Sequence, residues 1–446
     1  MKKTLFYIQM TLLVVSPISL WAQSNKPYDM TINGVKVIVQ PSGNEIVVVQ
    51  TIIKGGVQNY PAAKAGIENL AIRGLTECGT VKDDKNSFKD KLDKVSAQVY
   101  GYSDMDYASF TLNCIKPDLD KVWTLYTDAL LTPRFDSREF DRIKQDAINF
   151  IRTNESSPDY SIDQMAKQTA FAGKNYAKTP LGTVSSVSSI TVDDTKKYWQ
   201  SILTRSRMVI VVVADLDKKD IEQKIAPLIE KIPAGKPFIS KKENYNPITN
   251  TFVSQQRDNA TNYVQGITGG PLPGTPDYDA FVLAMRIFAT RHFVEIRTKN
   301  GLSYAPRISF NGGNTPYSNI SVSTTDPNKY IATARALIDK IKAEGLKESE
   351  LKNEKTGYLT GIYYRQETND EQANSLAANE VIHGNWRRSI NIKNDIKKVS
   401  LAQLNNTFKK YINNITWVYQ GDPKKVDAKM YTQKQTPGLP DEKKAF

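Results

Sequence analysis

The chain contains two histidines, and each stands three residues from a glutamate. The spacing in His292-Phe-Val-Glu295 and in Glu380-Val-Ile-His383 places both side chains of a pair on one face of a helix. Imidazole and carboxylate groups are common zinc ligands. One pair supplies too few ligands for a tetrahedral site, so a metal centre requires the two pairs to meet in space, as in di-iron helical bundles. An independent metalloenzyme built on the two histidines is therefore a less favoured interpretation, which elemental analysis would test.

A second set of polar residues follows a long apolar segment. In EIRTKNGLSYAPRISF, Arg297 precedes a Gly301-Leu302 turn, and Tyr304 stands seven residues after the arginine. A guanidinium is a fixed, always charged donor, and a phenol adds a second directional donor. The pair is therefore suited to binding an acceptor group. The alternative is structural: Arg297 pairs with a nearby acid, and Tyr304 only packs.

The N-terminus indicates that these residues belong to an exported protein. Lys2 and Lys3 precede an apolar run that ends near Val15, and a small-residue site follows at Ala22, a pattern typical of a signal peptide. We therefore expect the mature protein to be periplasmic or secreted. No later apolar run reaches the ~18–20 residues of a membrane span. The net charge of +13 comes from interleaved acids and bases, which favours solvated helix faces over a nucleic-acid-binding surface.

An internal repeat organises the rest of the chain. An alternating strand, a Pro/Asp turn and a helix-period segment begin at Tyr107 and recur at Ser318, 211 residues later. Helices with an acidic first turn begin at Ser137 and at Glu348, again 211 residues apart. Self-similarity of this kind indicates tandem copies. Strands stand before and after a run of helices in each copy, which predicts an α+β fold of two homologous domains, each an antiparallel sheet with helices packed on one face.

A Pro- and Lys-rich segment, IPAGKPFISKKENYNPI, marks the joint between the copies and is typical of an exposed linker. The sequence leaves open whether Cys78 and Cys114 form a disulfide. We expect a signal peptide at 1–22, a first domain at 28–233, a linker at 234–243, a second domain at 244–426 and a C-terminal tail at 427–446.

The segment AGIENLAIRGLTECGT, Ala65 to Thr80, follows a strand and indicates a helix that ends in Gly-Thr. Together with the duplication and with the arrangement of Arg297 and Tyr304, it resembles the pitrilysin/insulinase-type zinc peptidases, the inverzincins, over almost the whole mature chain. These peptidases carry H-x-x-E-H on the matching helix. Its two histidines bind Zn²⁺, its glutamate polarises the attacking water, and a more distal glutamate completes the ligand set.

The matching positions of this chain carry other residues. Asn69 stands at the first histidine, Ile72 at the glutamate and Arg73 at the second histidine. The distal ligand would fall near Asn149, and no glutamate occurs from 140 to 154. A neutral amide, an aliphatic side chain and a cation do not bind zinc or activate water. The resemblance therefore implies a degenerate zinc site and no cofactor in this chain.

The resemblance also assigns a role to the residues that remain. In the family, an arginine and a tyrosine in the second domain bind carbonyl groups of a peptide held at the zinc centre, and Arg297 and Tyr304 match them. We therefore expect a zinc-less subunit of an exported heterodimeric metallopeptidase, forming half of a clamshell. Zinc is expected in the partner subunit of the same family, and a peptide or unfolded polypeptide is the expected substrate. The alternative is a catalytically inactive structural or peptide-binding homodimer of the same fold.

Overall fold

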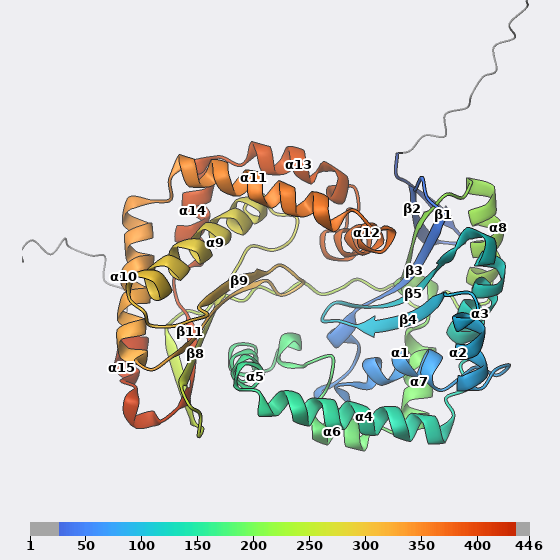
Figure 1. The fold of residues 1–446 in the computed structure, drawn as a ribbon, viewed down its shortest axis with the longest axis horizontal. Coiled ribbons are helices and arrows are strands. Elements are labelled where there is room, and N and C mark those ends of the chain that lie inside the picture. Colours follow the sequence, from blue (N-terminus) through green and yellow to red (C-terminus); the bar gives the residue numbers. More distant parts are fainter. Residues whose placement is uncertain (1–25, 434–446) are drawn as a thin grey trace, which may run out of the picture.

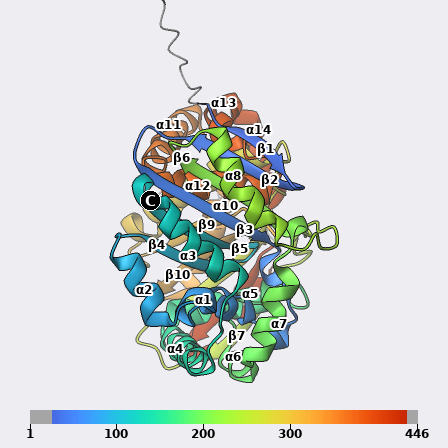
Figure 2. The same cartoon turned by 90° about the vertical axis from the view of Figure 1, so that its right-hand side faces the viewer.

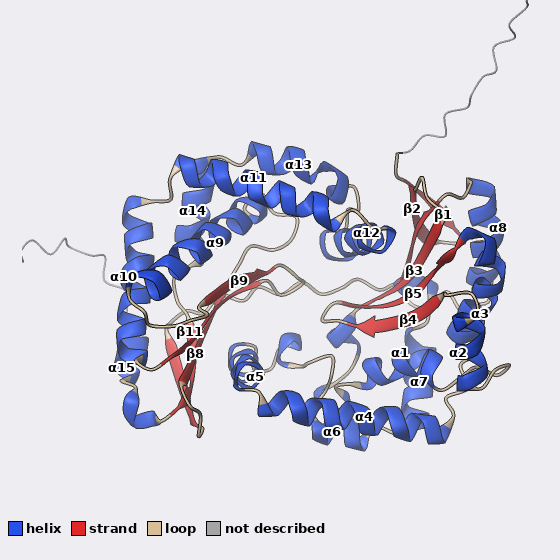
Figure 3. Cartoon of the chain, in the orientation of Figure 1, coloured by secondary structure: helices blue, strands red, loops and turns tan. Residues whose placement is uncertain are grey.

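The computed structural model describes residues 26–433, which form two β-sheets with associated helices (Figure 1). The expected signal peptide at 1–22 lies outside the described residues. The two sheets lie towards opposite ends of the molecule, and helices border both of them (Figure 3). None of the helices in the described part of the chain is long and apolar enough to cross a membrane.

The first sheet has six strands in the order β1-β2-β6-β3-β5-β4. Neighbouring strands are antiparallel except β2 and β6, which run parallel. The strand β6 has the sequence MVIVVVA, and all its residues are buried because helices cover both faces of the sheet. The strands of this sheet are β1 (Tyr28–Ile32), β2 (Val35–Pro41), β3 (Ile46–Lys54), β4 (Gln98–Ser103), β5 (Tyr107–Ile115) and β6 (Met208–Ala214).

The second sheet has five strands in the order β7-β11-β8-β10-β9, with β7 and β11 as its parallel pair. Its strands are β7 (Thr251–Gln256), β8 (Asn262–Gly269), β9 (Arg307–Asn311), β10 (Tyr317–Thr324) and β11 (Thr416–Gly421). The helices of the first half are α1 (Ile67–Glu77), α2 (Lys85–Asp93), α3 (Leu119–Leu131), α4 (Ser137–Ser156), α5 (Pro158–Ala170), α6 (Val184–Ser189), α7 (Val192–Ile202) and α8 (Lys218–Glu230). Those of the second half are α9 (Tyr278–Phe293), α10 (Pro327–Glu344), α11 (Glu348–Arg365), α12 (Asn369–His383), α13 (Arg388–Lys398), α14 (Leu401–Tyr411) and α15 (Ala428–Thr432).

The two halves have the same order of elements, so the predicted α+β duplication is confirmed. The strands β7, β8, β9, β10 and β11 occupy the places of β2, β3, β4, β5 and β6, while β1 has no counterpart. Each sheet is mostly antiparallel, as predicted, and contains one parallel pair. The reason is that the last strand of each half, β6 or β11, returns to the interior of the sheet after a long helical connection, which permits parallel pairing.

Each sheet is covered on its second face by a helix from the other half. The helix α12 packs on β3 and β6, and α5 packs on β8 and β11. Figure 2 shows α3 and α8 in front of the first sheet and α12 behind it. Leu376 and Trp386 are buried against strand residues such as Val211. Because α5 and α12 begin 211 residues apart, at Pro158 and Asn369, the two copies exchange equivalent helices.

The segment 231–250 contains no helix or strand and joins α8 to β7. The exact domain boundaries given above stay predictions. Cys78 and Cys114 are both free and buried, so they do not form a disulfide in this structure. Burial raises the pKa of the Cys78 thiol to about 12 and that of the Cys114 thiol to about 11.

Candidate functional site

The helix α1 carries the three residues at the positions of the expected zinc motif. Its apolar side packs into the first core, and Ile72 is only 1 % exposed. A Cβ atom on Gly101 of β4 would lie 2.5 Å from Cγ2 of Ile72, so this part of α1 lies directly on the edge strand. Asn69 and Arg73 are partly exposed beside it. The position of the expected catalytic glutamate is therefore occupied by a core side chain.

Arg73 belongs to a network of ion pairs between α1 and α4. Its Nε lies 2.8 Å from Oε1 of Glu77, and Oε2 of Glu77 also accepts a hydrogen bond of 3.0 Å from Arg142. Arg142 in turn donates to Glu139 and to Asp146. Burial alone would raise the pKa of Glu77, but the hydrogen bonds and charges of the two arginines bring it below its usual value.

The residues around this network do not fit a zinc ion. Arg73 places a permanent cation where a ligand would stand, and the nearby carboxylates are already bound to guanidinium groups. Asn149 is exposed on α4, where its Oδ1 accepts a hydrogen bond from Gln145. The first half therefore holds a salt-bridge network at the place of the expected metal site.

The two histidines do not assemble a metal centre within residues 26–433. No group of three histidine, cysteine, aspartate or glutamate side chains in that range is placed to hold a metal ion. His292 is buried with its Nε2 3.2 Å from the hydroxyl of Tyr330, and burial lowers the pKa of its imidazole to about 3. Burial likewise lowers the pKa of His383 to about 4. Glu295 and Glu380 each form an ion pair with a lysine.

A buried carboxyl group stands next to Asn69, and the sequence analysis did not anticipate it. Glu68 is fully buried and accepts hydrogen bonds from the hydroxyl of Tyr198 at 2.5 Å, from Ser103 at 2.9 Å and from the amide of Asn59 at 3.1 Å. Burial raises its pKa, and these hydrogen bonds oppose the rise. The signal in the sequence is a glutamate next to Ile67 and close to Leu70 and Ala71, the apolar residues that begin the helix. Its three partners come from three separate segments, so it fixes α1 against α7 and β4.

Arg297 and Tyr304 come together at the end of α9. The chain continues from α9 into a π-helical segment, Val294–Lys299, which contains Arg297; such segments occur often at functional sites. Gly301 follows with φ +59°, a conformation that favours glycine. The backbone N–H of Leu302 then donates to the carbonyl of Ile296. This tight turn places the guanidinium of Arg297 4.1 Å from the ring centroid of Tyr304.

The contacts of this pair argue against the structural alternative. Within residues 26–433, Arg297 has no acid within ion-pair distance and contacts only the rings of Phe293 and Tyr304. Tyr304 is 79 % exposed, so its ring does not serve as core packing. The cation–π contact holds the guanidinium without using its N–H donors. Both side chains are therefore free to bind an acceptor that approaches from solvent.

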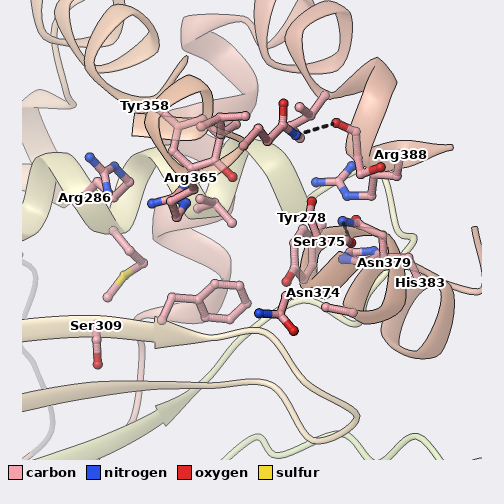
Figure 4. A pocket seen from close by; sticks show the side chains of 18 of the residues that line it. Tyr278, Arg286, Ser309, Tyr358, Arg365, Asn374, Ser375, Asn379, His383 and Arg388 are labelled. Atoms are coloured by element: carbon pink, nitrogen blue, oxygen red, sulfur yellow. Dashed lines mark hydrogen bonds between the residues drawn. The ribbon is translucent and has the colours of Figure 1, made fainter. Parts of the chain in front are cut away.

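Two cavities lie along the second sheet, and one of them borders this pair. One, of about 710 Å³, is lined by residues that include Phe293 and Ala305, the neighbours of Arg297 and Tyr304. The other, of about 850 Å³, lies among α9, α11, α12, α13 and β9 (Figure 4). Residues at the end of α9 and the start of β9 line both cavities, namely Ala289, Thr290, Ile308 and Ser309. The two cavities therefore share part of their walls at the end of α9 and the start of β9.

Comparisons with known proteins agree with this fold. Residues 36–184 match the sequence pattern described as Insulinase (Peptidase family M16), and residues 189–358 match the one described as Peptidase M16 inactive domain. The chain is 22 % identical over 385 residues to the non-peptidase homolog YmxG of Helicobacter pylori, which covers 83 % of this chain and 88 % of that protein.

Solved structures give the same result at lower identity. The peptidase M16 inactive domain from Pseudomonas fluorescens superposes with a TM-score of 0.80 at 17 % identity, covering 89 % of this chain and 98 % of that chain. The periplasmic protease PqqL from Escherichia coli superposes with a TM-score of 0.77 at 14 % identity, covering 94 % of this chain and 49 % of that chain. Together with the residues of α1, these matches show that the chain belongs to the insulinase (peptidase M16) family, as a non-catalytic member without the zinc ligands.

Proposed function

We propose that this protein is the zinc-less subunit of an exported heterodimeric metallopeptidase, in which Arg297 and Tyr304 orient a peptide at the zinc site of a partner of the same family. One contrast supports this proposal. The position of the water-polarising glutamate holds the buried side chain of Ile72, and the position of the second histidine holds Arg73, which forms an ion pair with Glu77. In the donor pair, in contrast, Tyr304 is exposed, and the partly buried Arg297 is held over its ring without a counter-ion in the described part of the chain.

The chemistry of the pair suits a peptide carbonyl. A guanidinium offers up to five N–H donors, and the Tyr304 hydroxyl offers one more. The ring of Tyr304 holds the guanidinium of Arg297 at 4.1 Å, which reduces the conformational entropy lost when a peptide binds. A hydrogen bond to a charged donor contributes roughly 1.5–3 kcal/mol. Donors of this kind stabilise the negative charge that develops on a carbonyl oxygen during hydrolysis.

An exported location is part of the same proposal. The N-terminal pattern of Lys2, Lys3 and an apolar run supports it. A periplasmic protease among the structural neighbours is consistent with it as well. N-terminal sequencing of the protein purified from its host should begin after Ala22, and a chain that retains Met1 would contradict export through a cleaved signal.

The test requires a partner subunit that carries an intact H-x-x-E-H motif. Alone, this chain should hydrolyse no peptide and bind no stoichiometric zinc. In the assembled complex, Arg297→Ala should reduce kcat/KM by about tenfold to a hundredfold, as expected for the loss of one oriented donor. Arg138→Ala, which removes an exposed arginine from α4, is the matched control and should leave the rate unchanged.

Three outcomes would decide between this proposal and its alternative. An unchanged kcat/KM for Arg297→Ala in the complex would remove the assigned role. A stable homodimer on size exclusion that binds peptides, but does not associate with an H-x-x-E-H chain, would favour a peptide-binding homodimer. A 1:1 complex with such a chain would favour the heterodimer.

A further inference from the structure

The 850 Å³ cavity lies in the second half, at the place that corresponds to the region between α1 and α4 in the first half. Its walls include α9, α11 and β9, which occupy the places of α1, α4 and β4. In the first half, Arg73, Glu77 and Arg142 bind one another across that region. In the second half, the corresponding helices leave an open pocket that faces α12 (Figure 4).

Three arginines line this pocket, and two of them are neutralised. Arg286 forms an ion pair with Glu354, and Arg388 forms one with Asp279. Arg365, the last residue of α11, is exposed, and its side chain has no hydrogen bond or ion pair with any residue from 26 to 433. In Figure 4 it points into the same space as Arg286 and Tyr358. The pocket thus offers one guanidinium whose donors are all free.

Neutral donors from the facing helix complete the pocket. Asn374 of α12 accepts a hydrogen bond of 2.9 Å on its Oδ1 from Gln50 of β3. This bond fixes the amide, and its Nδ2 has no acceptor within the described residues. The hydroxyl of Ser375 is likewise without a partner in that range. Burial raises the pKa of Tyr358, so its hydroxyl remains a donor at neutral pH.

We propose that this pocket binds a carboxylate group of a peptide, with Arg365 as the charged donor and Asn374 and Ser375 as neutral donors. A guanidinium fork matches the two oxygens of a carboxylate, and the pairing is charge-assisted. A free cation in the pocket disfavours a metal ion or a basic ligand. One carboxylate that faces the pocket, Glu371, has no ion pair in the described chain and opposes binding of an anion.

The position of the pocket links it to the proposed function, on which the choice of a peptide as ligand rests. Ala289, Thr290, Ile308 and Ser309 line both the pocket and the smaller cavity beside Arg297 and Tyr304. In the proposal, a peptide whose middle lies at that pair runs along this shared wall, so that one end or an acidic side chain enters the pocket. The pocket itself is built by this chain alone, so binding can be measured without a partner subunit.

The experiment is isothermal titration calorimetry on the purified full-length mature chain. The probe is an uncharged peptide of alanine, serine and glycine with an acetylated N-terminus, prepared with a free C-terminal carboxylate or with a C-terminal amide. The acid should bind about tenfold to a hundredfold more tightly than the amide, the effect of one charge-assisted hydrogen-bonded pair. Arg365→Gln should abolish this preference, whereas Arg138→Gln, the loss of an exposed arginine elsewhere, should retain it.

Further titrations identify whether the bound carboxylate is a chain end or a side chain, and they test whether any change of charge has the same effect. A third peptide carries a C-terminal amide and one internal glutamate. If it binds as tightly as the peptide with the free C-terminal carboxylate, the pocket accepts acidic side chains. If it binds only as weakly as the amidated peptide without glutamate, the pocket is specific for chain ends. Glu371→Gln should tighten binding of the acid, because it removes the unpaired carboxylate. Three results would overturn the proposal. The first is equal affinity for the peptide acid and the peptide amide, and the second is an equal loss of the preference in Arg138→Gln and in Arg365→Gln. The third is displacement of the peptide acid by inorganic phosphate at the same concentration. This titration contains no partner subunit. Its failure would therefore leave the kinetic test of Arg297→Ala in the assembled complex unaffected.

Discussion

Replacing Asp106 by asparagine is expected to stabilise the protein at neutral pH. Asp106 is 5 % exposed at the start of β5, next to the turn between β9 and β10 of the other half. Its Oδ2 accepts hydrogen bonds from the hydroxyl of Tyr176 at 2.7 Å and from the backbone N–H of Asn314 at 3.2 Å. Its Oδ1 is buried without a partner. Burial raises the pKa of this carboxyl to about 6, although the two hydrogen bonds oppose the rise.

The magnitude follows from the difference between the two pKa values. The folded pKa of about 6 lies above the ordinary value of 3.8, so the folded protein binds more protons than the unfolded chain between these pH values. The free energy of unfolding therefore falls as the pH rises from about 4 to about 6 and is constant above that. At 1.36 kcal/mol per pKa unit, the ionised carboxylate costs about 3 kcal/mol at pH 7.5 and about 1.5 kcal/mol at pH 5. Asparagine retains an oxygen that can accept both hydrogen bonds but carries no charge to bury.

The assay is urea unfolding at pH 5 and at pH 7.5, compared through the midpoints of the transition. Asp106→Asn should raise the midpoint at both pH values, by about twice as much at pH 7.5. Asp141→Asn, a change at an exposed acid on α4 that does not contact Asp106, is the control and should have little effect. A variant that is less stable than the wild type at pH 7.5, or a stabilisation that does not change between the two pH values, would refute the reasoning.

Two more predictions concern the core. In native protein at pH 8, Cys78 and Cys114 should not react with a thiol reagent, because both are buried and their pKa values are raised to about 12 and about 11. Unfolding in guanidinium chloride should expose two reactive thiols, and fewer would indicate a disulfide. Leu376→Ala in α12 should lower the free energy of unfolding by about 2–5 kcal/mol, because this 3 % exposed side chain packs on the first sheet. Tyr364→Ala, on the exposed side of α11, is the control. A decrease in the free energy of unfolding of less than about 1 kcal/mol for Leu376→Ala would contradict the packing of α12 on the first sheet.

The elements of the fold were predictable because their signals are local. The strand that begins at Tyr107 and the helix that begins at Ser137 have counterparts 211 residues later, and both pairs are found where the repeat predicts them. The identity of Asn69, Ile72 and Arg73 is also a property of the sequence, and it is sufficient to show that zinc ligands are missing. The apposition of Arg297 and Tyr304 was predictable for the same reason, since only a short turn separates them.

The arrangement of the two copies was decided by tertiary structure. Nothing in the sequence of α12 and the turn after it shows that Leu376 and Trp386 pack on strands of the other half, because helix periodicity identifies an apolar face but not its partner. The parallel pairing of β2 with β6 joins residues about 170 positions apart, from Lys36 to Val209, and leaves no local signal.

The same distinction applies to the polar sites. The sequence by itself determined which side chains are present and that the zinc motif is absent. Only the fold decided that Arg73 is bound within a network with Arg142, whereas Arg365 is left free beside Asn374 in an open pocket. The physical reason is that an ion pair depends on distances between groups far apart in the chain. Those distances are set by the packing of helices, including the exchanged α5 and α12, on the two sheets.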